Sequence, residues 1–191
     1  KNSLSSYNVS VSGLSGNLIN KEEVHLIIEA AKESTGTVDI LINSAGIYPN
    51  VNLLDMDDDV FNETINVNFR AAFLFARAFA QNMVTQQWGR IVNIGSSSGY
   101  SGFRGTSMYC ASKHALLGFS RAIHDELKEK NVRTYYVSPS STQSKMGLAT
   151  KGQDYATFLD PNDVAKYVVF AISFNSNIVS EEIFLKRMIY R

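Results

Sequence analysis

A tyrosine and a lysine stand four residues apart, Tyr109 and Lys113, in a stretch whose apolar pattern predicts a helix over 107–130. Residues at this spacing leave a helix on the same face, with Cβ atoms about 5–6 Å apart. An ammonium group that close favours the phenolate, because one charge at ~4 Å is worth about 4 kcal/mol at an effective dielectric near 20. We therefore expect the pKa of Tyr109 to fall from ~10 toward ~7, which suits a general acid or base.

A tyrosine and a lysine four residues apart also occur by chance. The alternative to a catalytic pair is therefore a tyrosine and a lysine on a helix surface without a chemical role. Three polar features upstream favour the chemical interpretation. Ser96 follows a predicted buried strand, thirteen residues before Tyr109, and Asn68 lies inside the stretch Ile-Asn-Val-Asn-Phe at 65–69. The turn Asn-Ser-Ala-Gly at 43–46 closes an earlier strand.

Alternating strand and helix patterns must position these residues. Short continuous apolar runs, typical of buried strands, predict strands at 39–42, 90–94, 132–137 and 183–185, and a further strand is expected at 9–12. Capping residues predict helix starts at Asn20, at Asp57 or Asp58, and at Asp160, and glycines predict helix ends at Gly36 and Gly89. This alternation predicts an α/β fold, a doubly wound parallel sheet with helices on both faces and ligands at the carboxyl ends of its strands.

Composition and charge narrow the function classes. The 191 residues predict one domain over 1–191, and 18 basic against 18 acidic side chains give no net charge. A neutral chain is not attracted to phosphate backbones or anionic lipid, so we expect neither a nucleic-acid nor a membrane partner. The single cysteine, Cys110, fits a reducing compartment and predicts a cytoplasmic protein. The three histidines lack metal-ligand spacing, so no metal site is expected.

Taken together, the turn, the asparagine, the serine and the Tyr-x-x-x-Lys pair resemble the short-chain dehydrogenase/reductase family, in particular its 3-oxoacyl-(acyl-carrier-protein) reductases. The resemblance runs from about Val9 to the C-terminus. It implies a Rossmann-like fold and an enzyme that moves hydride between NAD or NADP, with NADP the favoured cofactor, and a small carbonyl/alcohol substrate such as a 3-oxoacyl compound or another small ketone.

The resemblance assigns a role to each residue of the tetrad. Tyr109 is implied to exchange a proton with the substrate oxygen, and Ser96 to hydrogen-bond that oxygen. Lys113 is implied to lower the pKa of Tyr109 and to hold the nicotinamide ribose. Asn68 matches the asparagine that positions a water beside the lysine. Ser96 is chosen over its neighbours Ser97 and Ser98 on spacing alone.

Further residues are implied to bind the cofactor. The turn Asn43, Ser44, Ala45 and Gly46 corresponds to the segment under its ribose, where small residues permit close backbone approach. Asn17 and Leu18 correspond to the pair beside the adenine ring. Pro139 and Thr142 correspond to the loop that contacts the carboxamide.

Three departures from the family pattern stand out. Ser44 replaces an asparagine of the turn, a mild change, and Ser140 replaces a glycine, which predicts strain there if the position requires a positive φ. The glycine-rich turn that holds the pyrophosphate in the family does not occur in the sequence. We therefore expect a partial domain that lacks the first two strands of the fold, from a parent roughly 60 residues longer at ~30 residues for each strand–helix unit.

The resemblance also implies a homodimer or homotetramer, built on the phenylalanine-rich helix around 69–79 and the helix of Tyr109. Two alternatives stay open. One is a catalytically silent relative, a dinucleotide-sensing or scaffold protein that has kept the fold. The other is a structural fragment without nucleotide affinity, which is expected if the protein is as short as the sequence given.

Overall fold

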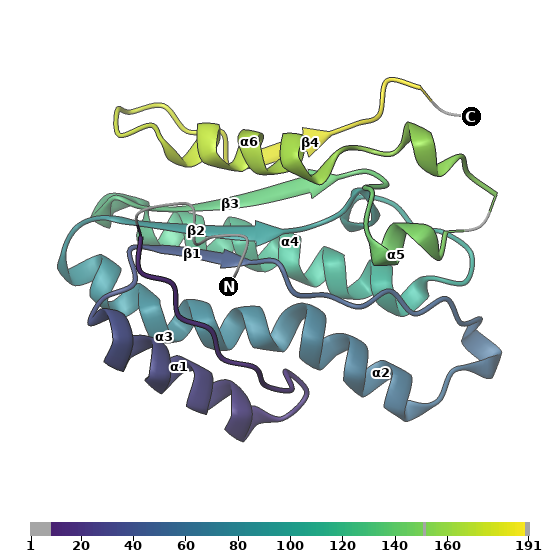
Figure 1. Ribbon diagram of the computed structural model, residues 1–191, viewed down its shortest axis with the longest axis horizontal. Helices are drawn as coiled ribbons and strands as arrows, with labels where there is room; N and C mark the ends of the chain where they lie inside the picture. The colour runs from purple at the N-terminus through teal and green to yellow at the C-terminus, as the bar shows by residue number, and fades with distance from the viewer. Residues whose placement is uncertain (1–8, 151, 190–191) are drawn as a thin grey trace.

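A computed structural model describes residues 9–150 and 152–189. Its four strands form one parallel sheet in the order β1 (Ile40–Asn43), β2 (Gly89–Ile94), β3 (Val132–Pro139) and β4 (Glu182–Leu185). The helices are α1 (Lys21–Thr35), α2 (Asp58–Ile65), α3 (Ala71–Thr85), α4 (Ser107–Leu127), α5 (Lys145–Leu148) and α6 (Pro161–Ile172). Figure 1 shows α1, α3 and α4 on one side of the sheet and α6 on the other. The predicted α/β sheet with helices on both faces is therefore confirmed.

Alternate residues of the strands supply the two apolar cores. Ile91 and Val132 pack against α1 and α3, and Tyr136 packs against α4. Their neighbours Val92, Tyr135 and Val137 face the other way, toward Val168 of α6. All of these side chains are buried, which explains why the strands read as continuous apolar runs rather than alternating ones.

Helix caps follow the predicted residues. The Asn20 side chain accepts hydrogen bonds from the N–H groups of Glu22 and Glu23, and Gly36 ends α1 with a φ of 71°. Asp57 caps α2, and Asp160 caps α6, which begins with a proline. Each cap satisfies backbone groups that a helix end leaves without partners. A single capping residue was therefore enough to predict each of these helix boundaries.

Two boundary predictions are wrong. Residues 9–12 are irregular rather than a strand, and in the described chain they pair with none of the four strands of the sheet. The helix predicted to end at Gly89 ends at Thr85, because Gln87 adopts a φ of 56° and leaves the helical path before β2 begins.

The first strand is covered on one face only. Leu41 packs into the core beside α1 and α3, but Ile40 and Ile42 are 43% and 49% exposed. Ile40 and Ile42 lie on the same face of the sheet as Val92 and Tyr135. On that face α6 covers β2 and β3 but leaves β1 exposed. Among the described helices, none is long and apolar enough to cross a membrane.

Candidate active site

Ser96 and Tyr109 meet where β2 ends and α4 begins. Ser96 follows the strand and caps a short 3₁₀ turn, its hydroxyl accepting a hydrogen bond from the N–H of Ser98 at 3.1 Å. Tyr109 lies in the first turn of α4 and is 6% exposed. The Ser96 side chain lies near enough to the Tyr109 phenol to lower its pKa slightly. Two hydroxyls thus lie close together at the carboxyl end of the sheet.

The protonation state of Tyr109 differs from the expectation. Burial raises its pKa above the usual 10, and the nearby Ser96 hydroxyl offsets only part of that effect. The predicted fall toward 7 is therefore wrong for this structure. The physical reason is the direction of the lysine: its Nζ lies 5.8 Å from the centre of the Tyr109 ring and is held elsewhere. A protonated, buried phenol is a proton donor.

Lys113 is turned toward the strand end. Its ammonium donates a hydrogen bond of 2.9 Å to the carbonyl oxygen of Ile94, and the side chain is 4% exposed. Burial lowers its pKa to about 8. The lysine therefore remains mainly charged at neutral pH, within a site where water is scarce.

Asn68 lies in a π-helical turn, Asn66–Arg70, between α2 and α3. Its carbonyl accepts from the N–H of Ile47 at 2.8 Å, and its amide donates to the carbonyl of Ile47 at 3.0 Å and to the Ser112 hydroxyl at 3.0 Å. Ser112 in turn donates to the carbonyl of Tyr109 at 2.7 Å. Asn68 thus ties the turn after β1 to the helix that carries Tyr109.

The turn at 43–46 begins with a hydrogen bond between strands. Asn43 donates to Asn93 of β2 at 2.8 Å, and Asn93 donates to Ser120 of α4 at 2.8 Å. Ser44 and Ala45 are exposed. A side chain at Gly46 would place its Cβ 3.4 Å from the Asn68 carbonyl oxygen and 3.8 Å from the Lys113 nitrogen. The open backbone of the turn therefore lies directly against two members of the tetrad.

Leu18 and the same turn line one hollow of about 230 Å³, and Asn17 lies beside it in sequence. Asn17 forms the turn before α1, where its N–H donates to Glu23 and its side chain accepts from Ile19. Leu18, Asn43, Ser44 and Ala45 thus line one hollow, whose other walls are mainly apolar side chains of α1 and α3.

Pro139 and Thr142 lie at the end of β3. The Thr142 hydroxyl donates to the carbonyl of Ser140 at 2.9 Å. The strain expected at Ser140 is absent, because the non-glycine residues with positive φ in the described chain are Gln87 and Asn131. The Ser140 hydroxyl instead accepts a hydrogen bond from the N–H of Arg187 at 3.1 Å.

Sequence reasoning missed Ser112, Tyr48 and Tyr136. Ser112 connects Asn68 to Tyr109, and Tyr48 packs edge-on against the Tyr109 ring with 4.7 Å between ring centres. Tyr136 contacts the backbone of Ser96 and Lys113. Ser112 could have been found, because a polar residue on the buried side of a helix indicates a hydrogen-bonding role. The pattern of Tyr48 and Tyr136 predicts only that they belong to the apolar core.

Known proteins share the sequence pattern of this chain. Residues 1–154 match the family model for short chain dehydrogenase. The chain is 36% identical over 157 residues to epidermal retinol dehydrogenase 2 of Mus musculus, covering 80% of this chain and 51% of the relative. It is 30% identical over 170 residues to the 3-oxoacyl-[acyl-carrier-protein] reductase FabG of Vibrio harveyi, covering 84% of this chain and 70% of that one.

A solved structure shows the same fold. A metagenomic short-chain oxidoreductase in complex with NADP superposes with a TM-score of 0.83 at 22% identity, covering 98% of this chain and 79% of that one. The chain spans about half the length of the retinol dehydrogenase that it matches. With a family model matched over most of its residues, the chain belongs to the short-chain dehydrogenase/reductase family.

Proposed function

We propose that this site interconverts a carbonyl and an alcohol, with Tyr109 as the proton donor and acceptor. The observation that carries the proposal is the proximity of the buried Ser96 hydroxyl to a buried Tyr109 whose pKa burial raises. Proton donation to a substrate oxygen needs a phenol aimed at that oxygen and a second donor beside it. The two groups come from different segments, the loop after β2 and the helix α4.

Residues of this chain support part of a nicotinamide dinucleotide site. The backbone at Gly46 is free of a side chain that would lie against Asn68 and Lys113, and the hollow beside Leu18 continues along the turn. We assign the cofactor to Asn17, Leu18, the turn 43–46, Tyr109, Lys113, Pro139 and Thr142. When bound, the reduced cofactor supplies the hydride that a carbonyl carbon accepts.

The chain's own side chains handle the charge that develops on the substrate oxygen. As this oxygen becomes negative, Ser96 donates a hydrogen bond to it and Tyr109 transfers its proton, which completes the alcohol. The Lys113 ammonium, held by the carbonyl oxygen of Ile94, is assigned to the cofactor ribose. In the reverse direction the Tyr109 phenolate takes the proton from the alcohol.

The substrate class proposed is a 3-oxoacyl compound or another small ketone. Relatives named as a 3-oxoacyl reductase and as a retinol dehydrogenase support carbonyl/alcohol chemistry in general. NADP is proposed ahead of NAD on the family resemblance. Initial rates with each cofactor, measured over a panel of acyl and cyclic ketones, test both choices.

Tyr109→Phe tests the proposal. The ring is buried against Tyr48, so the variant is expected to fold, while loss of the proton donor lowers kcat by roughly 10²–10⁴-fold. Tyr167→Phe, on the exposed face of α6, is the matched control and keeps the wild-type rate. A Tyr109→Phe variant with near-wild-type turnover refutes the role. Tight cofactor binding without turnover in the wild type supports a silent relative instead.

The proposal extends to assembly and location. We propose a homodimer or homotetramer through α3 and α4, where Phe73 is exposed beside Arg77. Sedimentation velocity with Phe73→Glu tests this, because a charge at the contact favours the monomer. A cytoplasmic location is proposed from the buried free thiol of Cys110, and cell fractionation tests it.

A further inference from the structure

Tyr136, in the middle of β3, places a hydroxyl between the two elements that carry the tetrad. The side chain is fully buried. Its hydroxyl lies 3.3 Å from the N–H of Ser96, from which it accepts, and 3.2 Å from the carbonyl of Lys113. It also lies 3.4 Å from the carbonyl of Ser96. One phenol thus contacts both the loop that follows β2, at Ser96, and the helix α4, at Lys113.

Two glycines make room for this ring. A Cβ at Gly95 would lie 2.0 Å from the Tyr136 ring carbon Cζ, and a Cβ at Gly99 would lie 2.1 Å from its hydroxyl. Neither glycine has a positive φ, so space rather than backbone conformation requires them. The loop that presents Ser96 is therefore shaped around Tyr136 on both sides of the serine.

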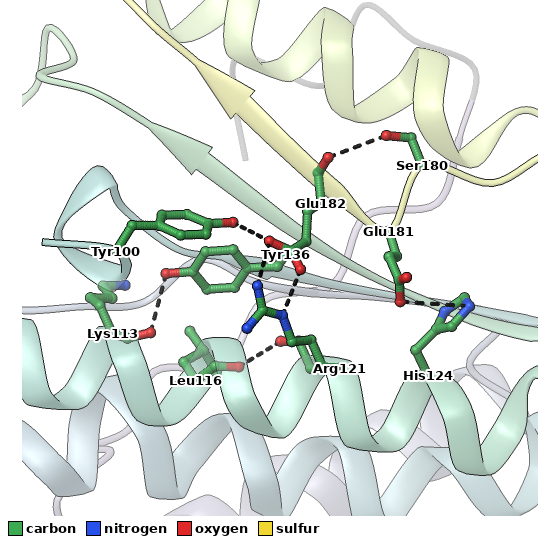
Figure 2. Close-up of polar contacts among 10 residues, drawn as sticks. Tyr100, Lys113, Leu116, Arg121, His124, Tyr136, Ser180, Glu181 and Glu182 are labelled. Carbon is green, nitrogen blue, oxygen red and sulfur yellow. Dashed lines mark hydrogen bonds and ion pairs between the residues drawn. The ribbon is translucent and has the colours of Figure 1, made fainter.

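A charged cluster encloses the ring from the far side. Tyr100 packs edge-on against Tyr136 with 6.0 Å between ring centres, and its hydroxyl donates to Glu182 at 2.6 Å. Arg121 of α4 donates to both oxygens of the Glu182 carboxylate, at 2.6 and 3.1 Å. Figure 2 shows Tyr136 lying between Tyr100 and the helix, with its hydroxyl toward Lys113. The ring has little freedom to move.

We propose that Tyr136 is a positioning residue that fixes Ser96 relative to the helix of Tyr109 and Lys113. This inference rests on the proposed function. The Lys113 ammonium, bonded to Ile94, is a second link between the same two elements. The two links use different groups. The Lys113 ammonium belongs to the candidate site itself, whereas the Tyr136 hydroxyl contacts only backbone groups of Ser96 and Lys113. Removing the phenol oxygen changes no side chain of the tetrad. It removes only a contact that fixes the backbone of Ser96 relative to that of Lys113.

Tyr136→Phe in the full chain tests this, with Tyr135→Phe as its matched control. Tyr135 is the adjacent residue, is equally buried and faces α6, away from Ser96. We expect Tyr136→Phe to lower kcat about tenfold with less than a twofold change in KM, since small misplacements act on the chemical step. We also expect faster amide hydrogen exchange in peptides that contain Ser96. Tyr135→Phe changes none of these quantities.

The outcomes separate the two proposals. Wild-type exchange at Ser96 in Tyr136→Phe overturns the positioning role, and so does faster exchange with a kcat equal to that of Tyr135→Phe. If the wild-type chain turns over no carbonyl substrate, the proposed function fails. The exchange rate at Ser96 then decides alone whether the Tyr136 hydroxyl holds the serine.

Discussion

The ammonium of Lys113 is bonded to the carbonyl oxygen of Ile94 at 2.9 Å, across the junction of α4 and β2. Keeping this ammonium charged costs free energy. The side chain is 4% exposed, and one carbonyl oxygen replaces the water molecules that would surround the ammonium in solution. Burial accordingly lowers the pKa of Lys113 to about 8. The charged form of Lys113 therefore lowers the free energy of unfolding, by an amount that depends on pH.

The stability of the fold is expected to rise with pH through this group. Between the folded pKa of about 8 and the unfolded value of 10.5, the unfolded chain binds more protons than the folded one. The penalty is complete below pH 8 and disappears as the pH approaches 10.5. Relative to Lys113→Met, the wild type should gain about 2 kcal/mol of unfolding free energy between pH 7 and pH 9.5.

Urea unfolding of the two proteins at both pH values measures this difference. Other groups that titrate in the range act equally on wild type and variant, so they cancel in the comparison. A difference between the two proteins that stays constant with pH would show that the lysine is not held in a buried, charged state.

Ser96 and Ser97 provide a direct test of which serine acts on the substrate. The Ser96 hydroxyl contacts Tyr109, whereas Ser97 is the next residue of the turn and half-buried. Ser96→Ala should lower kcat by about 10²–10³-fold, the usual effect of removing one donor to a developing oxyanion. Ser97→Ala should remain within about twofold of the wild type. Steady-state kinetics on both variants decide the matter, and equal losses would contradict the assignment.

The parts of the fold that were predictable follow from local rules. Asn20 and Asp160 specify helix starts because their side chains satisfy nearby N–H groups, whatever the rest of the chain does. The buried strands were visible because both of their faces are covered. The four residues of the tetrad lie at one edge of the sheet because the ends of parallel strands and the helix after them share that edge.

What escaped prediction depends on neighbours distant in sequence. Residues 9–12 have a strand-like pattern, but a strand forms only beside a partner. The direction of the Tyr109 pKa depends on where the Lys113 ammonium points, and the four-residue spacing does not fix that direction. Tyr136 reads as an ordinary core aromatic, because its role comes from glycines about forty residues earlier.

Asn68 is expected to contribute to stability as well as to the site. Its side chain makes three hydrogen bonds, two to Ile47 and one to Ser112, and it is 2% exposed. Asn68→Ala should cost about 2–3 kcal/mol, because it leaves buried partners unsatisfied. Asn66→Ala, in the same π-helical turn and half-buried, should cost under about 1 kcal/mol. Chemical unfolding compares them; equal costs would mean that the Asn68 contacts contribute little.

Gly46 is expected to matter for cofactor binding rather than for folding. A Cβ there would make ordinary contacts at 3.4 and 3.8 Å with Asn68 and Lys113, and its backbone has no positive φ, so Gly46→Ala should fold normally. The added methyl group would occupy space beside the lysine that is proposed to hold the cofactor ribose. We expect the KM for the cofactor to rise about tenfold, in the range of one methyl group in a close-fitting pocket.

Gly102→Ala is the matched control for this variant, because a Cβ at Gly102 has no atom within 4 Å and its φ is likewise not positive. The melting temperatures of both variants should equal that of the wild type, while only Gly46→Ala shows weaker binding in a titration of nicotinamide fluorescence. If Gly46→Ala binds the cofactor as tightly as Gly102→Ala does, the cofactor does not pass close to this turn. The turn would then serve only to tie β1 to β2 through Asn43 and Asn93.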